Sequence, residues 1–139
     1  MLLIEKIVFL KKVSLFARID SEELMAIVQI AQEESYAKDT LLFKESDFGD
    51  KFYVIVSGVV ELIKKEGEQD KKIAELSSGE YFGEMAILTE DGRSLTAVVS
   101  EPVLLLTINR DDFKSIIDEI PSLSFQIFKV LSDRIKSLL

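Results

Sequence analysis

The chain of 139 residues contains neither cysteine nor histidine. Without cysteine it has no disulfide bonds and no thiolate nucleophile. Without histidine it lacks the commonest general base, the Ser-His-Asp arrangement and the imidazole ligands of most zinc sites. These two absences exclude the most familiar forms of hydrolytic and zinc-dependent catalysis.

Oxygen ligands alone can still hold magnesium or calcium, and acidic residues are plentiful. However, Asp47, Asp50 and the acidic run 66–70 do not have the spacing of a calcium-binding loop. We interpret them as solvated turns, and we expect neither a metal nor a cofactor.

Long apolar runs and an excess of basic residues are also missing. No run approaches the ~20 apolar residues of a membrane helix, and the charges of Glu5 and Lys6 interrupt the segment where a signal peptide would be apolar. We therefore expect a cytoplasmic protein without membrane insertion. Seventeen basic against 25 acidic residues give a net charge of −8, which disfavours direct binding of nucleic acid. The length fits one domain over residues 1–139.

Helical patterns lie at both ends of the chain. Apolar residues at helical spacing predict a first helix over residues 3–13, and Asp20 is a candidate N-cap for a second helix that ends near residue 31. Asn109 is a candidate cap for a helix that ends before Pro121, and a last helix follows with a broad apolar face. The predicted helices therefore cover residues 3–31 and 110–139.

The middle of the chain, residues 33–108, is a series of short β-rich runs with glycine or acidic turns between them. Ser57 and Gly58 are expected to break one strand into the segments 52–56 and 59–63, and two further strands are expected over 93–100 and 103–108. Strands of this length and spacing predict an antiparallel barrel or jelly roll.

The strongest functional signal is the stretch 82–88, Phe-Gly-Glu-Met-Ala-Ile-Leu, followed by an acidic turn and Arg93. Gly83 permits a tight backbone, and a helical turn that begins at Glu84 presents unpaired amide N–H groups to a phosphate. Arg93 can add a bidentate contact to the same anion. Glu84 is a poor neighbour for a phosphate but a good acceptor for ribose hydroxyls. The pattern therefore suggests a sugar phosphate, such as a nucleotide.

The same residues resemble the phosphate-binding cassette of cyclic-nucleotide-binding domains. These domains occur in catabolite-activator-type regulators, cyclic-nucleotide-dependent kinases and cyclic-nucleotide-gated channels. Residues 47–58 resemble the strand-turn-strand signature of the family, and residues 76–81 resemble the turn before its cassette. The resemblance implies a mainly β fold, an antiparallel β-roll (double-stranded β-helix, jelly-roll topology) with N-terminal helices and a C-terminal two-helix hinge or lid.

The resemblance also implies a function and a site. The chain would be a regulatory sensor that binds cAMP or cGMP, with cAMP preferred, and passes a helix movement to an attached domain or partner. The implied ligand-binding residues are Gly83, Glu84, Met85, Ala86, Arg93, Ser94 and Leu95. Val60, Leu62 and Ile73 either line a base pocket or pack in the core, and Arg134 is either a lid residue or part of a solvated helix face.

Leu95 departs from the family pattern, which usually has a small alanine at this position. Its side chain either crowds the phosphate or points into the barrel. This departure motivates a second hypothesis, a ligand-insensitive module that interacts or forms a homodimer through the apolar stripe of residues 123–139. A third, enzymatic hypothesis would use Glu84, but no second catalytic group converges on it in the motif, and we predict no catalytic residue.

Overall fold

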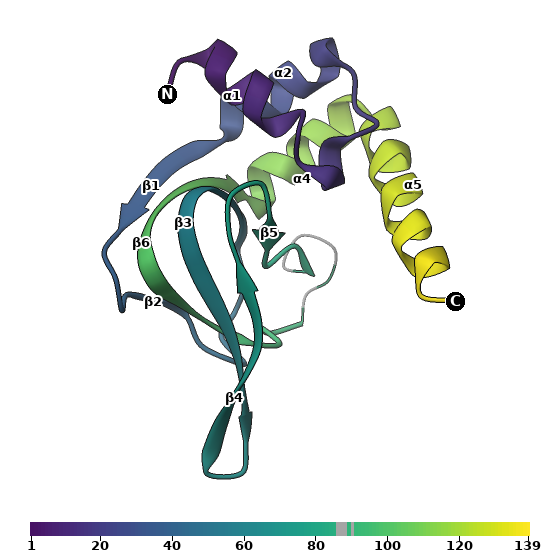
Figure 1. Ribbon diagram of the computed structural model, residues 1–139. Helices are drawn as coiled ribbons and strands as arrows, with labels where there is room; N and C mark the ends of the chain where they lie inside the picture. Colours follow the sequence, from purple (N-terminus) through teal and green to yellow (C-terminus); the bar gives the residue numbers. More distant parts are fainter. Residues whose placement is uncertain (86–88, 90) are drawn as a thin grey trace.

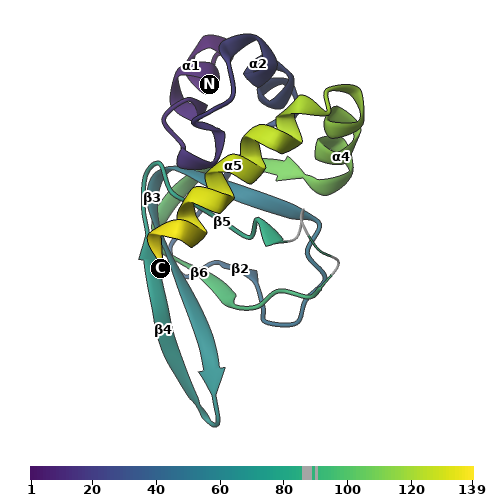
Figure 2. The same ribbon diagram turned by 90° about the vertical axis from the view of Figure 1, so that its right-hand side faces the viewer.

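Helices cover one end of a β-roll in the computed structural model, which describes residues 1–85, 89 and 91–139. Helices α1, α2 and α4 lie together over this end, α5 runs down beside the roll, and β3 and β4 project as a hairpin at the opposite end (Figures 1 and 2). This architecture confirms the predicted mainly β fold with helices at both ends of the chain. In chain order the elements are α1 (Leu3–Leu10), η1 (Ser14–Phe16), α2 (Ser21–Ile30), β1 (Gln32–Tyr36), β2 (Leu41–Phe43), β3 (Lys51–Glu66), β4 (Gln69–Leu76), β5 (Tyr81–Phe82), β6 (Thr96–Asn109), α4 (Arg110–Glu119) and α5 (Ser122–Ser137).

The strands pair antiparallel in the order β1-β6-β3-β4, and β2 also pairs with β6 and β5 with β3. The long ladder between β3 and β6 runs from the pair Lys51 and Asn109 to the pair Ile63 and Thr96. These two curved strands hold the other strands in place, and β3 also contributes Leu62 to the lining of the candidate site.

The predicted strand break at Ser57 and Gly58 is wrong, because β3 continues through both residues with shifts in register against β6. The two predicted strands at 93–100 and 103–108 are likewise one strand, β6. Gly58 has φ +92°, and a Cβ atom there would lie 2.2 Å from the carbonyl oxygen of Pro102. Glycine therefore allows the two strands to approach closely where they bend, instead of ending them.

The predicted helix caps at Asp20 and Asn109 are confirmed. The Asp20 carboxylate accepts a hydrogen bond from the Glu23 N–H at 2.8 Å, and the Asn109 side chain accepts one from the Asp111 N–H at 2.8 Å. The first helix ends at Leu10 rather than residue 13, because the chain turns there into η1. In the described part of the chain, no helix is both long and apolar enough to cross a membrane.

A first group of buried side chains, the helix-side core, joins the helices to one end of the roll. Its centre is Phe52 of β3, whose ring lies 6.2 Å from that of Phe16 and 6.1 Å from that of Phe113. Other members come from the N-terminal helices and the segments beside them, from β3 and β6, and from α4 and α5: Leu10, Val13, Leu15, Ile19, Leu24, Ile27, Val28, Ala31, Val54, Leu106, Ile108, Ile116, Leu123 and Ile127. This core fixes the helices on the roll.

A second group, the pocket-side core, fills the inside of the roll. Tyr53 and Phe82 stack with their ring centroids 4.8 Å apart and an interplanar angle of 6°, and Phe43 lies beside both rings. The remaining members are Ile55, Val60, Ala97, Val99, Val103 and Leu105. This core forms one wall of the candidate site.

Candidate functional site

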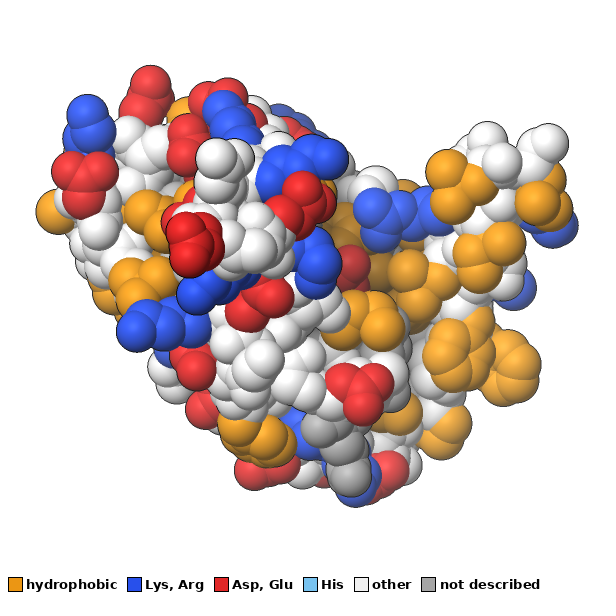
Figure 3. Space-filling view, turned by 90° about the horizontal axis from the view of Figure 1, so that it is seen from below, with side chains coloured by type: hydrophobic (Ala, Val, Ile, Leu, Met, Phe, Trp, Pro, Cys, Tyr) orange, Lys and Arg blue, Asp and Glu red, His pale blue; other side chains and the backbone are white. Residues whose placement is uncertain are grey.

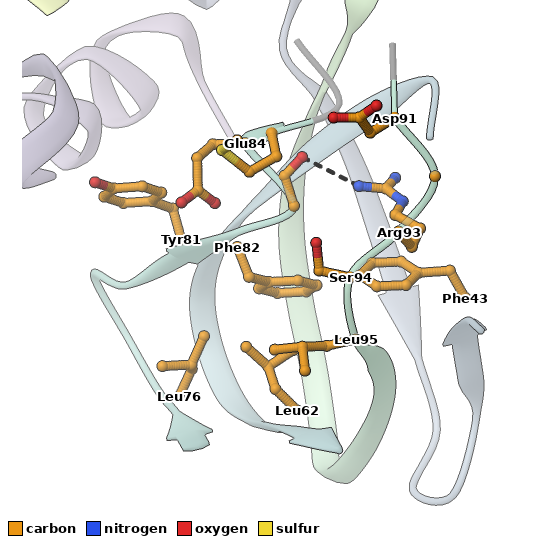
Figure 4. A pocket seen from close by; sticks show the side chains of 13 residues that line it. Phe43, Leu62, Leu76, Tyr81, Phe82, Glu84, Asp91, Arg93, Ser94 and Leu95 are labelled. Atoms are coloured by element: carbon orange, nitrogen blue, oxygen red, sulfur yellow. Dashed lines mark hydrogen bonds between the residues drawn. The ribbon is translucent and has the colours of Figure 1, made fainter. Parts of the chain in front are cut away.

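A pocket of about 270 Å³ opens beside β5, above the pocket-side core (Figure 4). Its described lining comes from β2, β3, β4, β5 and the segments on both sides of residues 86–90. Six of the seven predicted ligand-binding residues line it, and the seventh, Ala86, lies outside the described residues. The full described lining is Phe43, Leu62, Leu76, Tyr81, Phe82, Gly83, Glu84, Met85, Asp91, Gly92, Arg93, Ser94 and Leu95.

Gly83 has the tight backbone that the sequence predicts, with φ +77°. A Cβ atom at this residue would lie 2.6 Å from Nη1 of Arg93. Any other residue here would be strained and would also push the guanidinium away. Glycine is therefore required by both the local conformation and the approach of Arg93.

The Arg93 side chain points into the protein, and the residue is only 8% exposed. Its Nη1 donates to the carbonyl oxygen of Gly83 at 3.1 Å, as the dashed line in Figure 4 marks, and its Nη2 donates to that of Lys51 at 2.6 Å. Its central carbon lies 4.1 Å from the centroid of the Phe43 ring. The buried Nε has no hydrogen-bond partner among the described residues. One N–H of this cation is thus buried without an acceptor.

Burial changes the acid–base properties of this region. It lowers the pKa of the Arg93 guanidinium from its usual value, while the neighbouring Tyr53, Asp50, Asp47 and Glu84 act in the opposite direction. Burial also raises the pKa of Tyr53 to about 12, against the opposing charge of Arg93. Because an arginine side chain normally has a pKa above 12, Arg93 remains a cation at neutral pH.

The main chain around Arg93 is fixed by a turn that lies far away in the sequence. The Arg93 N–H donates to the carbonyl of Asp47 at 2.8 Å, and the Ser46 N–H donates to the carbonyl of Arg93 at 2.8 Å. The Asp47 carboxylate accepts from the Lys44 N–H at 3.0 Å. The turn that the sequence suggested was merely solvated therefore helps to place the arginine.

The opposite part of the pocket is apolar. Figure 4 shows Leu62, Leu76 and Leu95 together below Phe82, and Leu95 faces the pocket. Of the predicted base-pocket residues, Leu62 is in the described lining, whereas Val60 is fully buried in the pocket-side core and Ile73 is 47% exposed on β4. Val60 and Ile73 are not part of that described lining.

Arg134 reaches the edge of the pocket from α5. Its Nη1 donates to the hydroxyl of Tyr81, and its guanidinium carbon lies 5.1 Å from the centroid of that ring. Burial raises the pKa of Tyr81, and the charge of Arg134 opposes this rise. A second polar contact, between Arg18 and Asp133 at 2.8 Å, connects the same turn of α5 to the chain before α2.

Sequence reasoning missed several lining residues. Tyr81 lies directly before the recognised motif, so its position two residues before Gly83 was a usable signal. Asp91 lies in the acidic turn that the sequence treated as a spacer. Phe43 had no local signal, because it comes from a different strand and reaches the pocket only through the pairing of β2 with β6.

These features define a β-roll with a pocket that has a buried cation, a main chain that requires glycine at residue 83, and an apolar wall. The profile of the cyclic nucleotide-binding domain matches residues 33–119, which includes the pocket. The chain therefore belongs to the cyclic nucleotide-binding domain family.

Relatives include two classes of signalling protein and a receptor. The chain is 32% identical over 123 residues to the cyclic AMP receptor protein of Thermus thermophilus. This match covers 88% of the chain and 57% of the receptor protein. It is 33% identical over 116 residues to cGMP-dependent protein kinase, isozyme 1, of Drosophila melanogaster, a match that covers 81% of this chain and 15% of that kinase. The cAMP-dependent protein kinase regulatory subunit of Candida albicans is 33% identical over 110 residues, a match that covers 79% of this chain and 23% of that subunit. The chain thus spans between about one seventh and just over half of these relatives.

Solved structures agree on the fold. The crystal structure of the Thermus thermophilus catabolite activator protein has a TM-score of 0.79 at 31% identity, covering 90% of this chain and 59% of that one. A cyclic nucleotide-binding domain from Methylobacillus flagellatus has a TM-score of 0.81 at 25% identity, and the match covers 97% of this chain and 79% of that one.

Proposed function

We propose that this chain is a regulatory module that binds a cyclic nucleotide, with cAMP preferred over cGMP. The observation that carries the proposal is the convergence of Arg93, the main chain at Gly83 and the Glu84 carboxylate on one pocket with an apolar side. The relatives named for cAMP and cGMP support the ligand class. Residues 1–139 would act as one domain, and the role is binding rather than catalysis.

In this proposal each part of the pocket contacts a different part of the nucleotide. The cyclic phosphate lies against Arg93 and the amides of Gly83, Ser94 and Ala86, the last of which lies outside the described residues. The Glu84 carboxylate accepts from the ribose hydroxyl. The base lies toward Leu62 and Leu95, and Met85 borders the entrance.

The hydrogen bonds that Arg93 already forms determine how many of its N–H groups can bind a phosphate. Arginine has five N–H donors, of which two are bonded to the carbonyls of Gly83 and Lys51, while Nε has no partner in the part of the chain that the structure describes. A phosphate would give this cation an ionic acceptor, and each charge-assisted hydrogen bond contributes roughly 1.5–3 kcal/mol. Three or four such bonds with a buried base reach the ~8 kcal/mol of a micromolar ligand after the cost of association.

The signal would pass through α5. The contact between Arg134 and Tyr81 joins this helix to the edge of the pocket, so a nucleotide that contacts Tyr81 also changes the environment of Arg134. The segment 113–120, which makes up most of α4 and its C-cap, would act as the hinge that lets α5 close. A ligand shifts such an equilibrium only by the difference between its affinities for the two positions of the helix.

Calorimetric titration with cAMP and cGMP tests the proposal. We expect micromolar binding of cAMP by the wild type and a 10–100-fold weakening in Arg93→Ala, the effect of one charged contact of ~1.5–3 kcal/mol. No binding of either nucleotide up to millimolar concentration would overturn the proposal. If only Leu95→Ala binds, Leu95 blocks the natural site.

A specific observation also favours a second candidate, an interaction or dimerisation module. Five large apolar side chains of the last helix and its end are exposed, namely Phe125 (66%), Phe128 (53%), Ile135 (62%), Leu138 (85%) and the terminal Leu139. Figure 3 shows hydrophobic side chains along the projecting arm on its right, separated from the roll by a hollow. Sedimentation tests this candidate, and a strict monomer both with and without nucleotide would count against it.

A further inference from the structure

The described lining of the pocket has more acidic than basic side chains. Among the described lining residues, Arg93 is the one cation, whereas Glu84 and Asp91 are both carboxylates. Arg134 adds a positive charge at Tyr81, but Tyr81 and Arg93 lie on opposite sides of the pocket (Figure 4). Glu84 lies on the side of Tyr81, so the side that holds the buried Arg93 has one positive charge and, at Asp91, one negative charge (Figure 4).

Asp91 lies on the same side of the pocket as Arg93 (Figure 4). Its side chain is exposed and forms no ion pair with the described residues, and its N–H donates to Oγ1 of Thr89 at 3.4 Å. At the next residue, Gly92, a Cβ atom would lie 2.8 Å from the carbonyl oxygen of Ser46. The main chain that fixes Arg93 thus also fixes Asp91 beside it.

We propose that Asp91 is a specificity-determining residue that makes the pocket select a singly charged phosphate diester over the doubly charged monoester of the same nucleoside. This inference rests on the proposed function and adds the charge class of the ligand. A cyclic nucleotide carries one negative charge, and a monoester carries between 1.5 and 2 at neutral pH. The additional charge of the monoester is repelled by Asp91, while Arg93 can neutralise only one charge.

The expected size of the effect follows from Coulomb's law. At a distance of a few ångströms in a water-like dielectric, removing one like charge improves affinity about three- to fivefold for each charge on the ligand. Asp91 suits such a test because its side chain is exposed and is no part of the proposed phosphate or ribose contacts. Glu84 does not suit it, since that carboxylate is proposed to hold the ribose.

The experiment is a charge series with adenosine, cAMP and AMP, titrated against the wild type and Asp91→Asn. We expect the substitution to leave adenosine binding unchanged, to tighten cAMP about three- to fivefold and to tighten AMP about ten- to twentyfold. The gain for AMP relative to cAMP should shrink as salt is added, because salt screens charges at the surface. A change in packing would not depend on ligand charge or on salt.

Glu68→Gln is the matched control, since it removes an exposed carboxylate at the turn between β3 and β4, at the end of the hairpin far from β5 (Figure 1), and Glu68 is not in the described lining of the pocket. It should leave all three affinities unchanged. If the wild type binds cAMP but Asp91→Asn keeps the same ratio of AMP to cAMP affinity, or Glu68→Gln shifts that ratio equally, this inference alone is overturned. If the wild type does not bind cAMP at all, the proposed function fails and this inference fails with it.

Discussion

The two cores of this protein have similar strands but different contents. The helix-side core consists entirely of buried apolar side chains, and its aromatic rings meet one another at steep angles. The pocket-side core has a stacked pair of rings, and next to it lies a buried guanidinium whose Nε has no described partner. An unpaired buried donor costs stability, so its retention beside a cavity is typical of a functional site.

Comparing the two cores separates the residues of the sheet that stabilise the fold from those that form the candidate site. Strand β3 supplies both cores from adjacent residues, because Phe52 and Tyr53 point to opposite faces of the strand. Phe52 anchors the helices, and Tyr53 supports the arginine. Changes at these faces should therefore separate folding from binding.

The largest expected effect is in the helix-side core. Phe52→Ala should lower the free energy of unfolding by about 3–5 kcal/mol, because it removes a fully buried ring and leaves a cavity. Urea denaturation measures this loss. A loss below 1 kcal/mol would show that this core is not what holds the helices on the roll.

A smaller effect is expected at Gly83. Gly83→Ala should cost about 1–3 kcal/mol through its positive φ, and it should also weaken nucleotide binding by displacing Arg93. Gly79→Ala is the matched control, since Gly79 has φ +87° but nothing lies within 4 Å of its added Cβ. Chemical denaturation and nucleotide titration should show a similar stability loss in both variants but weaker binding only in Gly83→Ala.

Replacing Arg93 should affect stability still less. Arg93→Met should change the free energy of unfolding by less than about 2 kcal/mol, because relief from burying a charge offsets the two lost hydrogen bonds. Thermal unfolding of the unliganded protein measures this change. A loss as large as that of Phe52→Ala would mean that the arginine serves the fold rather than a ligand.

The smallest expected effect concerns the polar residues beside the pocket-side core. The hydrogen bond to Glu34 raises the pKa of Tyr36 from 10.0 to about 12. Since the folded state favours the neutral phenol, the resulting stabilisation is complete below pH 10 and is lost as the pH rises toward 12. Tyr36→Phe should therefore lose less stability than the wild type between pH 10 and 12 in urea denaturation. Parallel curves for the two proteins would contradict this assignment.

Much of the fold could be predicted because its signals are local. The caps at Asp20 and Asn109 and the glycine at residue 83 depend on neighbours within a few positions, and all three have the predicted geometry. The break expected at Gly58 was wrong because a glycine in a bulge and a glycine that ends a strand look the same in sequence. Strand register, which distinguishes them, is set by tertiary pairing.

The details of the candidate site were less predictable for the same reason. The residues that line the pocket near Gly83 and Arg93 are close in sequence and were found as one motif. The partners of Arg93 were not found, since the carbonyl of Lys51 is 42 residues away and Phe43 arrives on another strand. No local pattern indicates which carbonyl or ring a buried guanidinium will meet.

Calorimetric titration of cAMP into the wild type and Arg93→Met, both confirmed as folded, tests the central claim most directly. If Arg93 and the main chain at Gly83 bind the phosphate together, the wild type should bind at micromolar concentration and the variant 10–100-fold more weakly, as expected for one charged contact of ~1.5–3 kcal/mol. Equal affinities, or no binding by either protein, would contradict the account.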